Sequence, residues 1–199
     1  MMREYSQRGS VLIVSLIFLL LLTIVGVSSM NMTNLEERMA SNFRDHDMAF
    51  QAAEAALLEA EDFVENTFDT TQAYTNPACS GSMCYSAACT NGLCFQGSFD
   101  GSSTTVANCT PGTVNEWENS AVWTTASKTK LATEQVAGTV QNARYIVEFR
   151  CFMPRDPNNY EPDLNVFSEW SPAFRITAVA SGASTDSTVM LQSTYKLVN

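Results

Sequence analysis

The chain carries no charged residue from Ser10 to Leu35, and this constrains its fold more than any other feature. The densest apolar part runs from Val11 to Val27 and is interrupted only by Ser15, Thr23 and Gly26. With its flanks it reaches the ~20 residues that span a bilayer, whereas a secretory signal has an apolar region of only ~7–15 residues before its cleavage site. The sequence that follows, MNMTNLEERMASNF, reads as more helix. We therefore predict a transmembrane helix that is retained.

The charges on either side of this run predict its orientation. Arg3 and Arg8 precede it, and the segment from Ser28 to Phe68 holds nine acids and two bases. The positive-inside rule then places the N-terminus in the cytoplasm and the rest of the chain outside. The formal net charge of −10 argues against nucleic acid as a partner, because phosphate binding needs a basic face.

The acidic segment is predicted to continue the helix. It has no Pro or Gly from Val27 to Phe68, and apolar residues recur at steps of three, four and seven: Leu35, Met39, Phe43, Phe50, Ala53, Leu57, Ala60, Val64 and Phe68. The alanines of QAAEAA favour close packing against another element. Thr33 and Glu36 fit a capping box, which leaves a break or a fresh helix start near residues 28–34 open. An unbroken helix from Val11 to Asn66 would be ~84 Å long.

Six cysteines follow the helix, at positions 79, 84, 89, 94, 109 and 151. Their even number fits three disulfides in an oxidising compartment, and zinc binding by the thiolates is the alternative. We predict that residues 69–130 form an irregular, Cys-rich region, with Cys109–Cys151 as the favoured long-range bridge. The pairing of Cys79, Cys84, Cys89 and Cys94 stays open.

Residues 131–199 are predicted to form an antiparallel sheet. Strands are expected at Ala143–Phe152, Ala173–Ser181 and Ser187–Val198, because these segments alternate and are rich in β-branched and aromatic residues. The segment GASTD reads as a hairpin loop, and WENSAVWTTASKTK as either a strand or an irregular segment. The expected fold is α+β, with three or more strands packed on the outer half of the helix.

The sequence predicts no catalytic, cofactor or metal site. His46 is the single histidine, and no nucleophile signature or phosphate loop accompanies it. Oxygen ligands for calcium recur at Asp156, Asn158, Asn159, Glu161 and Asp163, but Tyr160 falls where a ligand belongs and the turn lacks glycine. We expect a solvated loop there.

The segment QRGSVLIVSLIFLLLLTIVGVSSMNMTNLEERMASNFRDHDMAFQAAEAAL resembles the N-terminal region of PilX-type minor pilins, and its start resembles the class III signal of type IV pilins and pseudopilins. The resemblance covers residues 7–57 and extends more weakly to the C-terminal strands. It implies a pilin-like fold and cleavage by a prepilin peptidase between Gly9 and Ser10. Residues 1–9 would be the leader, and residues 10–68 the retained helix. Val14 then occupies the fifth mature position, where pilins usually carry glutamate.

The resemblance also implies a function. The chain is expected to be a minor pilin, a structural subunit that helps initiate type IV pilus assembly and sits at or near the pilus tip. Its expected partners are other minor pilins, the major pilin, the prepilin peptidase and a tip adhesin. It would lie in the bacterial inner membrane before entering the extracellular pilus. The alternatives are a membrane-tethered adhesion or aggregation module, a K-type pseudopilin of type II secretion, an anchored enzyme, and an unrelated anchor with an amphipathic helix.

Overall fold

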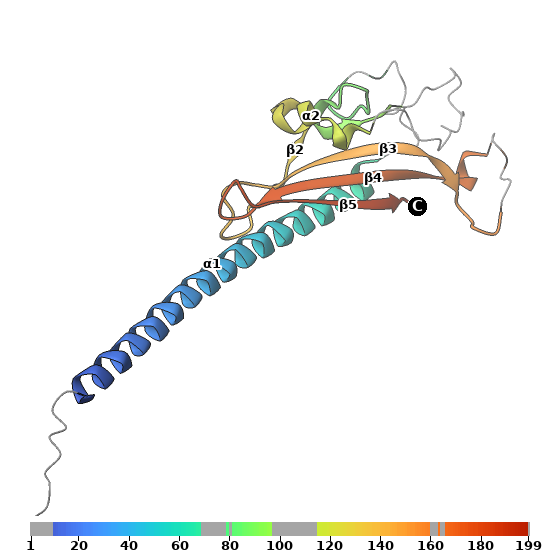
Figure 1. Ribbon diagram of the computed structural model, residues 1–199. Helices are drawn as coiled ribbons and strands as arrows, with labels where there is room; N and C mark the ends of the chain where they lie inside the picture. Colours follow the sequence, from blue (N-terminus) through green and yellow to red (C-terminus); the bar gives the residue numbers. More distant parts are fainter. Residues whose placement is uncertain are drawn as a thin grey trace, which may run out of the picture. The chain divides into compact units, whose positions relative to one another are not determined.

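The computed structural model describes residues 10–68, 79, 81–96, 115–159, 163 and 166–198. The chain divides into two compact units, Met1–Arg44 and Asp45–Asn199. One long helix, α1 (Ser10–Thr67), contributes to both units (Figure 1). The helix does not break at residues 28–34. The Thr33 hydroxyl donates to the carbonyl of Ser29 at 3.1 Å, within the helix, and so does not cap a new one.

The first unit presents an exposed apolar helix. Within the part of the chain that the structure describes, α1 is the one helix long and apolar enough to cross a membrane, and none of its apolar window is buried. Leu35, Met39 and Phe43, three of the apolar residues that recur along the predicted helix, are exposed as well. If these side chains are to leave water, another molecule has to cover them.

The second unit is built around a mixed sheet. Strands β3 (Arg144–Pro154), β4 (Trp170–Ser181) and β5 (Thr188–Lys196) are antiparallel neighbours (Figure 1), which confirms the three predicted strands. The short strand β2 (Lys130–Leu131) pairs antiparallel with the start of β3. Strand β1 (Leu93–Cys94) pairs in parallel with the same edge of β3, further along the strand, a pairing that was not predicted from the sequence.

The segment before β2 is mostly helical, which neither alternative of the sequence analysis foresaw. It contains the 3₁₀ turns η2 (Glu116–Glu118) and η3 (Ala126–Lys128) and the short helix α2 (Ser120–Thr124). The Asn119 side chain caps α2 by accepting a hydrogen bond from the Ala121 amide at 3.1 Å. Val122 packs in a small core with Cys89, Cys94 and Ile146, so that the cap and this burial outweigh the β propensity of the sequence. A further 3₁₀ turn, η1 (Thr90–Gly92), precedes β1.

The part of α1 in the second unit packs on the opposite side of the sheet from α2 (Figure 1). Its inner face is made mainly of alanines that are fully buried: Ala49, Ala53, Ala56 and Ala60. Small side chains let the helix approach the sheet closely, as the QAAEAA motif predicted. Phe50, another of the recurring apolar residues, does not take part in this packing and is 42% exposed. Ala49 takes the buried position beside it, because the close approach leaves no room for a ring.

We expect Ala56→Leu to lower the free energy of unfolding by about 1–3 kcal/mol, because the added methylenes must displace packed sheet side chains. Ala55 is the matched control, since it is the next residue of the same helix and is exposed. Ala55→Leu should change the free energy by no more than about 0.5 kcal/mol. Urea unfolding of the full chain in detergent micelles, followed by tryptophan fluorescence, measures both. Equal effects of the two substitutions would show that the alanine face is not closely packed.

Candidate functional site

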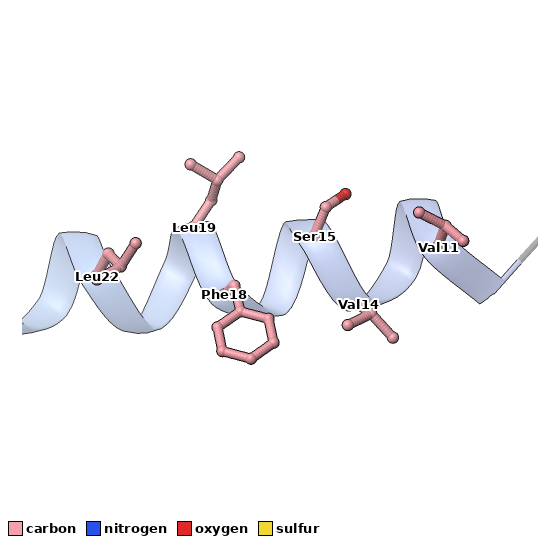
Figure 2. A pocket seen from close by; sticks show the side chains of 6 residues that line it. All are labelled: Val11, Val14, Ser15, Phe18, Leu19 and Leu22. Carbon is pink, nitrogen blue, oxygen red and sulfur yellow. The ribbon is translucent and has the colours of Figure 1, made fainter.

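The first candidate surface is the helix face around Val14. Six side chains line a shallow hollow along α1 (Figure 2), and Val14 points the same way as Phe18. The other four are Val11, Ser15, Leu19 and Leu22. The Ser15 hydroxyl donates to the carbonyl of Leu12 at 2.9 Å, so the polar group on this face is satisfied within the helix. A face without titratable groups can bind only apolar surface, either lipid chains or another apolar helix.

The predicted cleavage site adjoins this face. Ser10 is the first residue of α1, and Gly9 lies outside the described residues. Val14 is 49% exposed. The roles of Gly9, Ser10 and Val14 stay predictions.

Four carboxylates of α1 accept hydrogen bonds from the sheet and loops of the second unit, which we call the head. Asp45 accepts hydrogen bonds from the amides of Ala183 and Ser184 and, at 2.8 Å, from the Ser184 hydroxyl, all in the β4–β5 hairpin. At Gly182 in the same loop, a Cβ atom would lie 2.3 Å from the backbone oxygen of Asp45, so this contact requires glycine.

Three further acids of α1 repeat this arrangement. Glu59 accepts from the Thr133 amide at 2.7 Å, from the Thr133 hydroxyl at 3.0 Å and from the Tyr145 hydroxyl at 3.3 Å. Two acids nearer the end of α1 bind β5: Glu61 accepts from Ser193 at 2.9 Å and Glu65 from Tyr195 at 3.3 Å. These contacts could not be predicted from the sequence, because the partners of the acids lie far away in the chain.

These contacts shift several pKa values. The Ser184 hydroxyl lowers the pKa of Asp45, an effect that burial partly opposes. Burial, followed by the charge of Glu59, raises the pKa of Tyr145. Burial lowers the pKa of Lys130, and Glu59 opposes this shift; the Lys130 ammonium lies 3.3 Å from the centre of the Phe63 ring. The acids and their partners therefore act as structural ties.

We expect Asp45→Asn to flatten the pH dependence of stability in the acid range. The folded pKa of Asp45 lies below its usual value, so its stabilising contribution is complete above the unfolded pKa and is lost as the pH falls through the folded pKa. The melting temperature of the wild type should exceed that of the variant at pH 7, and the difference should shrink below about pH 4. Thermal unfolding between neutral and acid pH measures this difference.

Asp47→Asn is the matched control for the Asp45 experiment. Asp47 is exposed and its carboxylate accepts from Gln51 of the same helix at 2.8 Å, so no contact with the hairpin is lost. This variant should keep the wild-type pH profile. If Asp45→Asn keeps it too, the hairpin contact contributes nothing to stability.

The cysteines between 79 and 94 pair with their nearest neighbours. The disulfides are Cys79–Cys84 and Cys89–Cys94, which settles the pairing left open from the sequence and leaves none of these four sulfurs for zinc. Cys89 and Cys94 are fully buried against Ile146 of β3. Cys151 is disulfide-bonded. Cys109 lies outside the described residues, so the Cys109–Cys151 bridge stays a prediction.

The remaining candidates from the sequence serve their own loops. His46 is exposed on α1. The Asp156 carboxylate accepts from the amide of Asn158 at 2.8 Å and from its side chain at 3.1 Å, which forms a local turn. Asn159 and the amide of Asp163 donate to Glu169, at 3.4 Å and 2.9 Å. Glu161 lies outside the described residues. These contacts hold the loop, and among the described residues no three potential ligands gather for a metal.

Comparison with known proteins gives two matches to family models. Residues 8–58 match the PilX N-terminal family, and residues 67–197 match the family described as type IV pilus assembly protein PilX, C-terminal. No curated protein and no solved structure is similar enough to match. The first match contains the Val14 face and most of α1, and the second contains the sheet. The chain therefore belongs to the PilX family of type IV pilus assembly proteins and has a pilin-like role in assembly of the pilus.

Proposed function

We propose that this chain is a non-catalytic minor pilin that helps initiate type IV pilus assembly and sits at or near the pilus tip. Val14 carries this proposal. It stands at the fifth position after the predicted cleavage site, where pilins usually have a glutamate. A carboxylate within a membrane is costly and is tolerated where it meets a partner amine. A subunit with valine there lacks this contact with a subunit ahead of it, and so suits the first position in a filament.

The proposed path of the chain begins in the inner membrane. A prepilin peptidase cuts between Gly9 and Ser10 on the cytoplasmic side, and the helix spans the bilayer once with the rest of the chain outside. The apolar run and the basic residues before it support this topology. The N-terminal sequence of the mature protein checks the cut: a start at Ser10 supports the proposal, and an intact leader contradicts it.

The exposed apolar side chains set the mechanism of transfer into the pilus. Between Val11 and Val27, fourteen large apolar side chains are exposed. Moving them all into water would cost on the order of 20–40 kcal/mol, which exceeds the ~5–15 kcal/mol stability of a typical domain. The helix therefore has to pass directly from lipid to the helices of other minor pilins and the major pilin. The head would face outward, where it can contact further minor pilins or a tip adhesin.

Val14→Glu tests the tip placement. We expect labelled wild-type subunits at one end of each pilus and Val14→Glu subunits distributed along its length, because the new carboxylate supplies the missing contact. Val11→Glu is the control: it adds the same charge to the same hollow, but out of register with the partner amine, and should not redistribute the label. Even labelling by the wild type, unchanged by Val14→Glu, would contradict the proposal.

Deletion of the gene distinguishes a role in pilus assembly from the alternative role as an adhesion module. Loss of surface pili supports a role in initiation. Normal pili with lost aggregation or attachment would support the adhesion module instead, since the subunit would then be dispensable for assembly.

A further inference from the structure

A cleft of about 340 Å³ opens on the second unit, on the side of the sheet that α2 covers. This volume lies at the small end of the range for ligand pockets. The lining residues come from α2, from the loop before β3, from the first residue of β3 and from the end of β4: Trp123, Thr124, Gln141, Arg144, Val179 and Ser181. None of them belongs to the core between α1 and the sheet, and none has a part in the proposed function.

Arg144 brings a positive charge to this cleft. It is half-buried, and its Nη1 donates to the carbonyl of Trp123 at 3.2 Å. No described carboxylate lies within 4.0 Å of its guanidinium. The contrast is Arg175, whose fork binds both oxygens of Glu148 at 2.7 Å. A guanidinium has five N–H donors, and among the described residues only the Trp123 carbonyl accepts from that of Arg144, so the group can bind a planar, bidentate acceptor. A carboxylate is the group that fits them.

The other walls suit a ligand with hydroxyl groups and one apolar face. The Trp123 indole is fixed, because its Nε1 donates to the carbonyl of Trp117 at 2.9 Å. With Val179 it offers apolar surface of the kind on which the C–H face of a sugar ring packs. Thr124, Gln141 and Ser181 add two hydroxyls and an amide, which both donate and accept hydrogen bonds.

We propose that this cleft binds a single acidic sugar unit, with its carboxylate on Arg144 and its ring against Trp123. Arg144 stands directly opposite Val179 in the β3–β4 register, so the charged and apolar contacts lie side by side. A ligand of this size is expected to bind with a dissociation constant on the order of 1 mM. The acidic charge of the whole chain opposes binding, but salt screens distant charges more than it screens the local pair. This site is independent of the tip placement.

The test uses the full chain in phosphocholine micelles, whose head groups contain no sugar, with ¹⁵N-labelled tryptophan. Glucuronate should shift the indole N–H signal of Trp123 saturably and leave that of Trp170, which lies outside the cleft, unmoved. Glucose lacks the carboxylate and acetate lacks the ring, so each should bind at least about ten-fold more weakly.

Variants locate the site. Arg144→Gln should weaken glucuronate binding at least about ten-fold, whereas Arg150→Gln, which removes another half-buried arginine of β3 outside the cleft, should change it by less than about two-fold. Val179→Phe fills the cleft, keeps Arg144 and should also abolish binding. The Trp170 signal reports whether each variant is folded. The absence of a saturable shift up to about 50 mM glucuronate, equal binding of glucose or acetate, or full binding by Val179→Phe would overturn the proposal.

Discussion

Arg175→Met should lower the free energy of unfolding by about 3–5 kcal/mol. Nε and Nη2 of Arg175 each donate to one oxygen of Glu148 at 2.7 Å, and Nη1 donates to the side chain of Asn115 at 3.1 Å. The two charged side chains are only 15% and 4% exposed. Removal of the guanidinium would leave the Glu148 carboxylate buried without this partner, which is far more costly than the loss of an exposed ion pair.

The double variant Arg175→Met, Glu148→Leu identifies the cause. With both charges replaced by apolar groups, no uncompensated carboxylate remains, and stability should return to within about 1–2 kcal/mol of the wild type. Arg150→Met is the control for loss of a half-buried arginine that forms no ion pair with a described carboxylate, and it should cost about 1 kcal/mol or less. Urea unfolding in micelles measures all three. A double variant as unstable as Arg175→Met would refute this account of the pair.

Phe174→Ala is expected to cost about 3–5 kcal/mol, because it empties the centre of an aromatic cluster. Phe174 is fully buried, and the centre of its ring lies 5.0 Å from that of Phe68, 5.7 Å from that of Phe149 and 5.9 Å from that of Tyr85. Phe68 follows the last residue of α1, so the cluster joins the end of the helix to the sheet. The substitution should therefore loosen the contact of α1 with β4 as well as leave a cavity.

Phe50→Ala is the matched control for Phe174→Ala. It removes the same ring from the outer face of α1, where the side chain is 42% exposed, and should cost about 1 kcal/mol or less. Urea unfolding separates the two. Similar losses from both would mean that the aromatic cluster does not stabilise the head beyond ordinary surface contacts.

The long elements of this fold could be predicted because their signals are local and repeated. The uncharged run, the helix formers up to Phe68 and the alternation in three strands each extend over many residues. Strand β1 has only two residues and no period, and its second residue, Cys94, is the last of four closely spaced disulfide-bonded cysteines. Its parallel register beside Val147 depends on tertiary contacts, so nothing in the sequence indicated it.

Of the candidate sites, one could be predicted from local sequence and the other could not. The Val14 face follows from one continuous stretch of sequence and from its resemblance to pilins. The cleft could not be predicted, since Arg144 looked like an ordinary strand residue and Trp123 belongs to the segment whose conformation the sequence left open. The ties of Glu59 were equally hidden, because Thr133 lies 74 residues further along the chain. Only folding brings such residues together.

Because α1 forms hydrogen bonds with β5, the head can complete its folding only late in synthesis of the chain. Glu61 accepts its hydrogen bond from Ser193, which is added 132 residues later during synthesis. Until β5 (Thr188–Lys196) has been synthesised, β4 lacks its outer neighbour. The hydrogen bonds of Glu61 with Ser193 and of Glu65 with Tyr195 cannot form before then. Nascent chains consequently need shielding from aggregation and proteolysis, and a premature stop within the final strand is expected to remove the whole subunit rather than shorten it.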